Sequence, residues 1–194
     1  ETTSLNEKVG TFEKLVTLDP ELLKKYSKVY FLNEHYEPSA LIEIDQAYVS
    51  DPARTLEFHA QAYPYLAQMI ESAHSDDVDL VVASAYRSFK TQATLKANNT
   101  VVYGAGTANR FSADQGYSEH QLGTTIDFIT TGLNGNLTTN FDTTDSYIWL
   151  TNNAHRYGFI LSYPKGNAYY IYEPWHWRFV GIKLAKYFLL PDVI

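Results

Sequence analysis

The sequence of 194 residues contains no cysteine, and this absence excludes several kinds of chemistry. Without a thiol the chain can form no disulfide, offer no thiolate nucleophile and bind no zinc through sulfur. Any metal site must therefore be built from His, Asp or Glu side chains. The absence also suits, without requiring, a bacterial protein that is exported to an oxidising compartment.

A long hydrophobic run is also missing, because no apolar stretch reaches the roughly 20 residues that a membrane-spanning helix needs. We therefore predict no membrane span in this chain. The sequence begins with Glu1 instead of Met and shows no basic and apolar leader. We expect that an N-terminal signal peptide, anchor or tag was removed. We also expect the protein to work outside the cytoplasm, in the cell envelope or secreted, but this expectation rests on the motifs described below and not on the first residue.

Positive charge is scarce, with 15 Lys and Arg residues against 22 Asp and Glu residues and a formal net charge of -7. This balance argues against nucleic acid as a partner, since phosphate binding depends on Lys and Arg. Hydrophobic residues make up 45% of the chain, which is typical of a globular fold. The length predicts one domain over residues 1–194, in which residues 1–11 form an N-terminal extension. We also expect a monomer.

Helices are predicted by capping residues and by apolar periodicity. Asp19-Pro20 and Asp51-Pro52 each place an N-cap acid before a proline, which predicts two helix starts. Pro64 predicts a kink in the second helix. The apolar stripe of that helix, with three- and four-residue spacing, consists of Leu56, His59, Tyr63, Leu66, Ile70 and Ala73. Further helices are predicted over residues 89–98, 147–157 and 181–190. Gly158 is expected to end the helix before it.

Strands are predicted where β-branched and aromatic residues gather between turn residues. They cover residues 78–83, 122–130, 159–163, 168–172 and 175–180. The last three are expected to form a small antiparallel meander. A long loop is expected over residues 104–116, and Asn134-Gly135 predicts a turn. These elements predict an α+β fold, in which several helices pack on a small, mostly antiparallel sheet.

The first of two notable histidine segments covers residues 118–127 and reads Ser-Glu-His-Gln-Leu-Gly-Thr-Thr-Ile-Asp. It places His120 and Asp127 on either side of Gly123. A straight strand would point the two side chains to opposite faces, whereas a bend at the glycine would bring both inward. The segment alone is also compatible with a capped strand that carries a surface His and an Asp at the core edge.

The second segment, Glu-Pro-Trp-His at residues 173–176, places a carboxylate three residues before His176. Pro174 forbids an ordinary helical turn, so the segment differs from the helical His-Glu-x-x-His zinc motif. An aromatic edge strand with Glu173 at its mouth, and with the His packed between two Trp residues, would explain the segment equally well.

Together, the two segments offer the donor set of a catalytic zinc site. Two neutral imidazoles and one carboxylate can hold Zn²⁺ while its fourth position stays open to water. Zinc lowers the pKa of that water from 15.7 to roughly 7, and Glu173 remains as a base that can accept its proton. The predicted chemistry is metal-assisted amide hydrolysis.

Three motifs carry a resemblance to a known family. They are Ser-Ala-Tyr-Arg-Ser at residues 84–88, Gly-Tyr-Ser-Glu-His-Gln-Leu-Gly at residues 116–123 with Asp127, and Glu-Pro-Trp-His-Trp-Arg at residues 173–178. In this order and spacing they resemble the VanY-type D-alanyl-D-alanine carboxypeptidases and the related L,D-carboxypeptidases. The likeness covers roughly residues 12–190, and it implies the fold shared by hedgehog domains and D-Ala-D-Ala peptidases.

The resemblance also implies roles for individual residues. The ligands of one Zn²⁺ would be His120, Asp127 and His176. Glu173 would be the catalytic base, and Arg87 would polarise the scissile carbonyl or receive the terminal carboxylate of the substrate.

Further residues that match groove-lining positions of the family are Tyr86, Gln92 and Ser118. Alternatively, Arg87 and Gln92 could be a surface pair at a helix start, and Ser118 an ordinary loop hydroxyl. Thr125 departs from the family, which commonly has Ala there, so its hydroxyl should need a hydrogen-bond partner.

The function that follows is a zinc carboxypeptidase that removes the C-terminal D-alanine from peptidoglycan stem peptides. Whether the scissile bond is D,D or L,D stays open. Two alternatives are a cell-wall endopeptidase on the same scaffold and a non-catalytic, zinc-stabilised binding module like the hedgehog domain. The presence of both Glu173 and Arg87 favours an enzyme.

Overall fold

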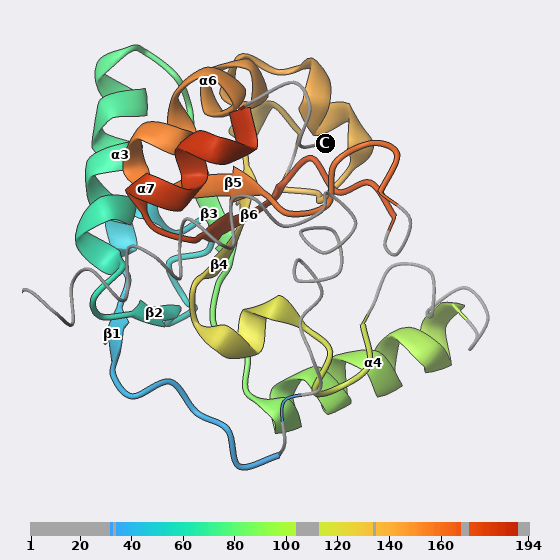
Figure 1. The fold of residues 1–194 in the computed structure, drawn as a ribbon. Helices are drawn as coiled ribbons and strands as arrows, with labels where there is room; N and C mark the ends of the chain where they lie inside the picture. The colour runs from blue at the N-terminus through green and yellow to red at the C-terminus, as the bar shows by residue number, and fades with distance from the viewer. Residues whose placement is uncertain (1–31, 33, 104–112, 134, 168–170, 190–194) are drawn as a thin grey trace, which may run out of the picture.

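A four-stranded antiparallel sheet forms the centre of the fold (Figure 1). Its strands, in the order β3-β4-β6-β5, are β3 (Val81–Ser84), β4 (Thr125–Ile129), β6 (His176–Phe179) and β5 (Phe159–Leu161). A separate antiparallel pair consists of β1 (Leu41–Glu43) and β2 (Glu57–His59). This computed structural model describes residues 32, 34–103, 113–133, 135–167 and 171–189.

In the described part of the chain, four α-helices accompany the sheets: α3 (Tyr63–Ser75), α4 (Phe89–Tyr103), α6 (Asp145–Asn153) and α7 (Ile182–Ala185). Short 3-10 turns connect the elements: η1 (Gln46–Tyr48), η2 (Glu119–Leu122), η3 (Thr131–Leu133), η4 (Thr139–Thr143), η5 (Ala154–Tyr157) and η6 (Lys186–Leu189). In Figure 1, α3, α6 and α7 surround one side of the sheet, whereas α4 lies apart from them. The predicted α+β class is therefore confirmed.

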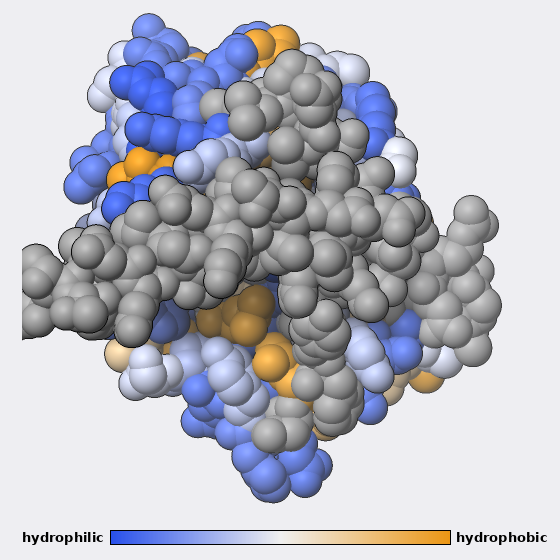
Figure 2. Space-filling model, viewed as in Figure 1, coloured by the Kyte–Doolittle hydropathy of each residue, from blue (hydrophilic) through white to orange (hydrophobic). Residues whose placement is uncertain are grey.

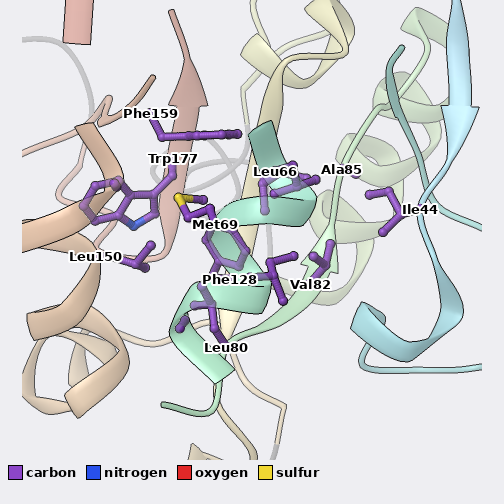
Figure 3. Close-up of a cluster of buried hydrophobic side chains, with 14 of the residues drawn as sticks. Ile44, Leu66, Met69, Leu80, Val82, Ala85, Phe128, Leu150, Phe159 and Trp177 are labelled. Atoms are coloured by element: carbon purple, nitrogen blue, oxygen red, sulfur yellow. The ribbon is translucent and has the colours of Figure 1, made fainter. Parts of the chain in front are cut away.

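The core lies between α3 and one face of the sheet. Helix α3 buries Leu66 and Met69 on its apolar face. Figure 3 shows these side chains close to Phe128 of β4 and Trp177 of β6, which belong to the same buried cluster. Each such side chain contributes about 1.5–3 kcal/mol when it is fully buried. Because side chains alternate along a strand, the neighbours of Phe128 and Trp177 face away from this core.

Several predicted elements are confirmed. The helix predicted over residues 89–98 is α4, which continues to Tyr103. The helix predicted over 147–157 is α6 followed by η5, and Gly158 ends it with φ 86°. Within the segment predicted as a helix over 181–190, the structure has α7 followed by η6, which ends at Leu189.

The helix predicted after Asp51-Pro52 is wrong in its first part. The Asp51 side chain accepts a hydrogen bond from Ala53 N at 3.0 Å, and this closes a turn instead of capping a helix. Strand β2 follows, and α3 begins only at Tyr63. Pro64 therefore lies in the first turn of α3, where the backbone N–H groups form no hydrogen bonds within the helix. A proline here breaks no such bond, so the predicted kink is also wrong.

The predicted strand over residues 122–130 is shorter than expected, because its first residues belong to η2 and its closing glycine. The predicted meander contains β5 and β6, but Ile171 and Tyr172 have no strand structure. Strand β6 also pairs with β4, which the sequence did not predict. Six predicted features lie wholly or partly outside the described residues. They are the extension 1–11, the helix start at Asp19-Pro20, and parts of the segment 104–116, of the turn at Asn134-Gly135, of the segment 168–172 and of the helix 181–190.

The surface of the described residues is mostly hydrophilic on the face shown in Figure 2, with small, separate hydrophobic patches. Among the helices of the described part of the chain, none combines the length and the apolar character that crossing a bilayer would take.

Candidate metal centre

The central sheet places two of the predicted ligands next to each other. Asp127 in the middle of β4 is the register partner of His176, the first residue of β6. Figure 1 shows these two strands side by side at the centre of the molecule. Since Ile126 and Trp177 belong to the core, the alternation of side chains turns Asp127 and His176 to the opposite face.

The third predicted ligand, His120, comes from η2 rather than from a strand. Gly123 closes this turn in the left-handed conformation, with φ 72°, and its N–H bonds to the carbonyl of His120 at 3.1 Å. The chain does bend at Gly123 as predicted, but the bend ends a 3-10 turn and does not lie within a strand. A Cβ at this position would lie 2.9 Å from Pro38 Cγ, so glycine is also required for space.

The three side chains converge on one point. One ligand atom from each of His120, Asp127 and His176 lies within 4.8 Å of the others, and all three residues are buried. Asp127 Oδ2 is 3.1 Å from His120 Nε2, and Asp127 Oδ1 is 3.0 Å from His176 Nδ1. The spacing and the donor types fit a single metal ion.

The outer hydrogen bond of His120 decides which nitrogen can bind a metal. His120 Nδ1 lies 2.6 Å from the carbonyl oxygen of Ala85, which can only accept, so Nδ1 carries the proton. Nε2 then presents a lone pair toward Asp127. Among the described residues, this buried nitrogen has no hydrogen-bond partner. A metal cation is one partner that this lone pair could accept.

The electrostatic surroundings favour a positive charge at the convergence point. Burial and the Arg87 guanidinium lower the pKa of His120 to about 4, which keeps this imidazole neutral. Burial alone would raise the pKa of Asp127, but the contacts with His120 and His176 lower it below its ordinary value. Burial also opposes the charge on His176. The carboxylates of Asp127 and Glu119 raise the pKa of His176 to about 10.

Glu173 lies at the edge of the cluster, with Oε2 at 3.6 Å from His176 Nδ1. Burial raises its pKa to about 7, and the negative charge of Asp127 adds to the effect of burial. A carboxyl group with this pKa can both accept and release a proton near neutral pH. Glu173 therefore lies beside the cluster with a raised pKa, and its role as the base stays a prediction.

Two further residues, which the sequence did not predict, support the cluster from behind. Glu119 is 1% exposed, and its Oε2 lies 3.0 Å from His176 Nε2. Its other oxygen accepts a hydrogen bond from Arg178 Nη1 at 2.6 Å. Burial alone would raise the pKa of Glu119, but Arg178 and His176 lower it. The only sequence signal was the position of this acid directly before His120.

Arg87 approaches the cluster from the segment after β3. Its backbone N–H donates to the carbonyl of His120 at 3.2 Å. Burial lowers the pKa of the guanidinium, while the charges of Asp127 and Glu173 oppose this effect. Within the described part of the chain, its buried Nε has no hydrogen-bond partner. The neighbouring Tyr86 is half-buried, and its N–H donates to Glu57 O at 3.0 Å.

The other residues that matched groove-lining positions are both buried. Gln92 of α4 donates through Nε2 to Ala113 O at 2.8 Å, which ties the helix to the segment before η2. Ser118 directly precedes η2, and its carbonyl accepts from Gln121 N. Contacts of these two residues with a substrate stay predictions. The hydroxyl of Thr125 has the partner that it was expected to need, because it donates to Glu119 O at 3.2 Å.

Comparison with known proteins gives concordant results. The family model described as VanY, D-alanyl-D-alanine carboxypeptidase, matches residues 55–182. The chain is 34% identical to the protein YodJ of Bacillus subtilis (strain 168), over 87% of this chain and 63% of YodJ. It therefore spans less than two thirds of the length of this curated relative.

Two solved structures share the fold. The LdcB LD-carboxypeptidase is 34% identical, with a TM-score of 0.73 over 81% of this chain and 75% of LdcB. A mutant of the D,D-pentapeptidase VanY from a VanB-type resistance cassette, solved in complex with Zn(II), is 28% identical. Its TM-score is 0.64, over 80% of this chain and 85% of that one. The predicted D-Ala-D-Ala peptidase-like fold is confirmed.

Proposed function

Because the chain belongs to the VanY family of D-alanyl-D-alanine carboxypeptidases, we propose that it is a zinc-dependent enzyme that removes the C-terminal D-alanine from peptidoglycan stem peptides. The observation that carries the proposal is the convergence of His120, Asp127 and His176 with Glu173 beside them. A substrate in the cell wall implies that the enzyme works outside the cytoplasm. We propose that it acts as a monomer.

The residues present fit Zn²⁺ as the metal. Its ligands would be His120 Nε2, a carboxylate oxygen of Asp127 and His176 Nδ1. The buried, unpartnered Nε2 of His120 supports this assignment, and two nitrogens with one oxygen form a common donor set of catalytic zinc. When bound there, zinc supplies Lewis-acid polarisation of the scissile carbonyl and lowers the pKa of water.

Proton transfer is the task of Glu173. Its carboxylate accepts the proton of the water that attacks the scissile carbonyl, and it then donates this proton to the leaving amine of D-alanine. Burial raises the pKa of Glu173, which supports a carboxyl group that can hold a proton as well as accept one.

Arg87 is proposed to hold the negative charge that develops on the carbonyl oxygen during attack. Its guanidinium lies near Asp127 and Glu173, whose charges oppose the lowering of its pKa by burial. The unpartnered Nε offers a donor that needs no rearrangement before the reaction. Tyr86, Gln92 and Ser118 would line the groove for the peptide.

Digestion of synthetic stem peptides tests the proposal. The zinc-loaded protein is incubated with a pentapeptide ending in D-Ala-D-Ala and with a tetrapeptide ending in a diamino acid and D-Ala, and the products are identified by mass. Loss of one alanine from the pentapeptide indicates D,D-activity, and loss from the tetrapeptide indicates L,D-activity. Glu173→Gln is the control and should reduce either rate by about 10²–10⁴-fold.

Two outcomes would replace this proposal by another. An internal cut would show an endopeptidase on the same scaffold. No cleavage of any peptide by a chain that binds zinc would indicate a binding module instead of an enzyme.

A further inference from the structure

We infer that Glu119, itself held by Arg178, is a positioning residue that fixes the ring of His176 for metal binding. The inference rests on the proposed zinc site. It concerns a buried carboxylate that makes no direct approach to the substrate in the proposed mechanism.

The two nitrogens of His176 face different carboxylates. Nδ1 lies 3.0 Å from Asp127 Oδ1, inside the cluster, whereas Nε2 lies 3.0 Å from Glu119 Oε2. A neutral imidazole has one N–H and one lone pair, so it can bind a metal through Nδ1 only when its proton is on Nε2. Glu119 accepts that proton in a hydrogen bond and thereby selects the tautomer and the ring orientation.

Glu119 can perform this role because hydrogen bonds hold both its carboxylate and its backbone carbonyl. Arg178 Nη1 donates to Oε1 at 2.6 Å, and the hydroxyl of Thr125 donates to the backbone carbonyl of Glu119 at 3.2 Å. Thr125 and Arg178 are register partners on β4 and β6. Arg178 also lies two positions after His176, so both side chains point to the same face of the sheet.

His120 provides a useful contrast within the same site. Its outer partner is the backbone carbonyl of Ala85, at 2.6 Å, which no side-chain substitution removes. His176 depends instead on a carboxylate side chain. Glu119 is therefore the place where the outer hydrogen bond of a ligand can be changed without changing the ligand itself.

Glu119→Gln is the central experiment. The glutamine keeps the volume of the side chain, but its amide cannot accept both from His176 and from Arg178 as the carboxylate does. We expect the zinc Kd, measured by competition with a chromophoric chelator, to rise about 10–100-fold. We also expect a changed visible spectrum of the Co²⁺-substituted protein, because the ring of one ligand is no longer held.

A purely structural role for Glu119 would give a different result. Asp79→Asn serves as the matched control, because Asp79 is a carboxylate with several hydrogen bonds at the opposite end of the β3–β4 pair. It should lower the free energy of unfolding while leaving the zinc Kd and the Co²⁺ spectrum unchanged. If Glu119→Gln behaves like Asp79→Asn, the inference is overturned.

A second variant keeps the test decisive should Glu119→Gln not fold. Arg178→Lys retains the positive charge but loses the planar fork, so Glu119 is held less firmly. The zinc Kd should rise, by less than in Glu119→Gln, and an unchanged Kd with an unchanged Co²⁺ spectrum would overturn the inference.

Peptide cleavage is measured separately from zinc binding. In one outcome, the wild-type chain binds one zinc and the variants bind it more weakly as expected, while no stem peptide is cleaved. This result supports the role of Glu119 and overturns the proposed activity. A wild-type chain that binds no zinc overturns both.

Discussion

At the scale of single residues, the site is marked by buried polar atoms that have no partner in the described part of the chain. Both His120 Nε2 and Arg87 Nε belong to this group. Leaving such an atom buried and unpaired costs about 1–3 kcal/mol. The two atoms lie in the region where a cation and the charge of a reacting carbonyl are proposed to be bound. Their cost is offset when these groups bind.

Arg87→Met should lower kcat much more than it raises KM. The methionine fills similar space but removes the donors that hold the developing oxyanion, and loss of one such donor lowers kcat by about 10²–10³-fold. Steady-state kinetics with a stem peptide measures the effect, and the zinc content should stay at the wild-type level. A large rise in KM with an unchanged kcat would instead assign Arg87 to the terminal carboxylate of the substrate.

The residues of the site differ in how well they could be predicted. The motifs predicted His120, Asp127 and His176, which the structure brings together. Glu119 was not predicted, because its role depends on the pairing of β4 with β6. That pairing brings Arg178 and His176 to the same carboxylate, and no local pattern in the sequence encodes it.

At the scale of elements, turn residues were more informative than apolar spacing. Gly158 was predicted to end a helix, and the structure confirms it. The spacing of Leu56 and His59 suggested a helix, but these residues lie before and at the end of β2. Three- and four-residue steps can arise by chance across a turn and a short strand, so periodicity alone could not separate β2 from α3.

Gly158→Ala should destabilise the protein by about 2 kcal/mol or more, since it combines backbone strain with overpacking. Its φ is +86°, and a Cβ there would lie 2.7 Å from Phe179 Cε2 and 2.9 Å from the backbone of Gly181. Gly166→Ala is the matched control, because Gly166 has a similar φ of +82° but no atom within 4 Å of the added Cβ. It should cost about 1 kcal/mol. Urea unfolding measures both, and equal losses would show that packing around Gly158 relaxes.

Asp79→Asn should lower stability in a way that depends on pH. Asp79 Oδ2 accepts from Thr130 Oγ1 at 2.8 Å and from the N–H and hydroxyl of Thr131, both at 2.6 Å, which ties the end of β4 to the start of β3. Burial would raise its pKa, but these hydrogen bonds lower it below the ordinary value. The stabilisation is therefore complete above the unfolded-state pKa of about 3.9, and it is lost as the pH falls through the folded-state pKa.

The measurement is urea unfolding of both metal-free proteins at several pH values. At pH 7 the variant should be less stable by about 1.5–3 kcal/mol, the usual range for hydrogen bonds to a charged group. The difference should shrink below about pH 4 as the carboxyl group becomes protonated. A difference that stays constant down to pH 2 would contradict the role of the charge.

At the scale of the whole molecule, the proposed metal joins segments that are far apart in the chain. His120 comes from η2, Asp127 from β4 and His176 from β6, and the last two positions are 49 residues apart. In the unfolded chain these ligands do not form a site, so zinc binds the folded state alone. The ion should therefore stabilise the fold as a whole and not only the local turn.

Addition of zinc to the chelator-treated protein should raise its melting temperature strongly. At a free zinc concentration of 1,000 times Kd, linkage adds about 4 kcal/mol. For a domain of this size, that energy corresponds to an increase of about 8–16 °C. Asp127→Asn, which removes a charged ligand but little volume, should respond much less, and excess chelator should reverse the wild-type shift. An equal shift in wild type and Asp127→Asn would place the stabilising zinc somewhere other than between η2, β4 and β6.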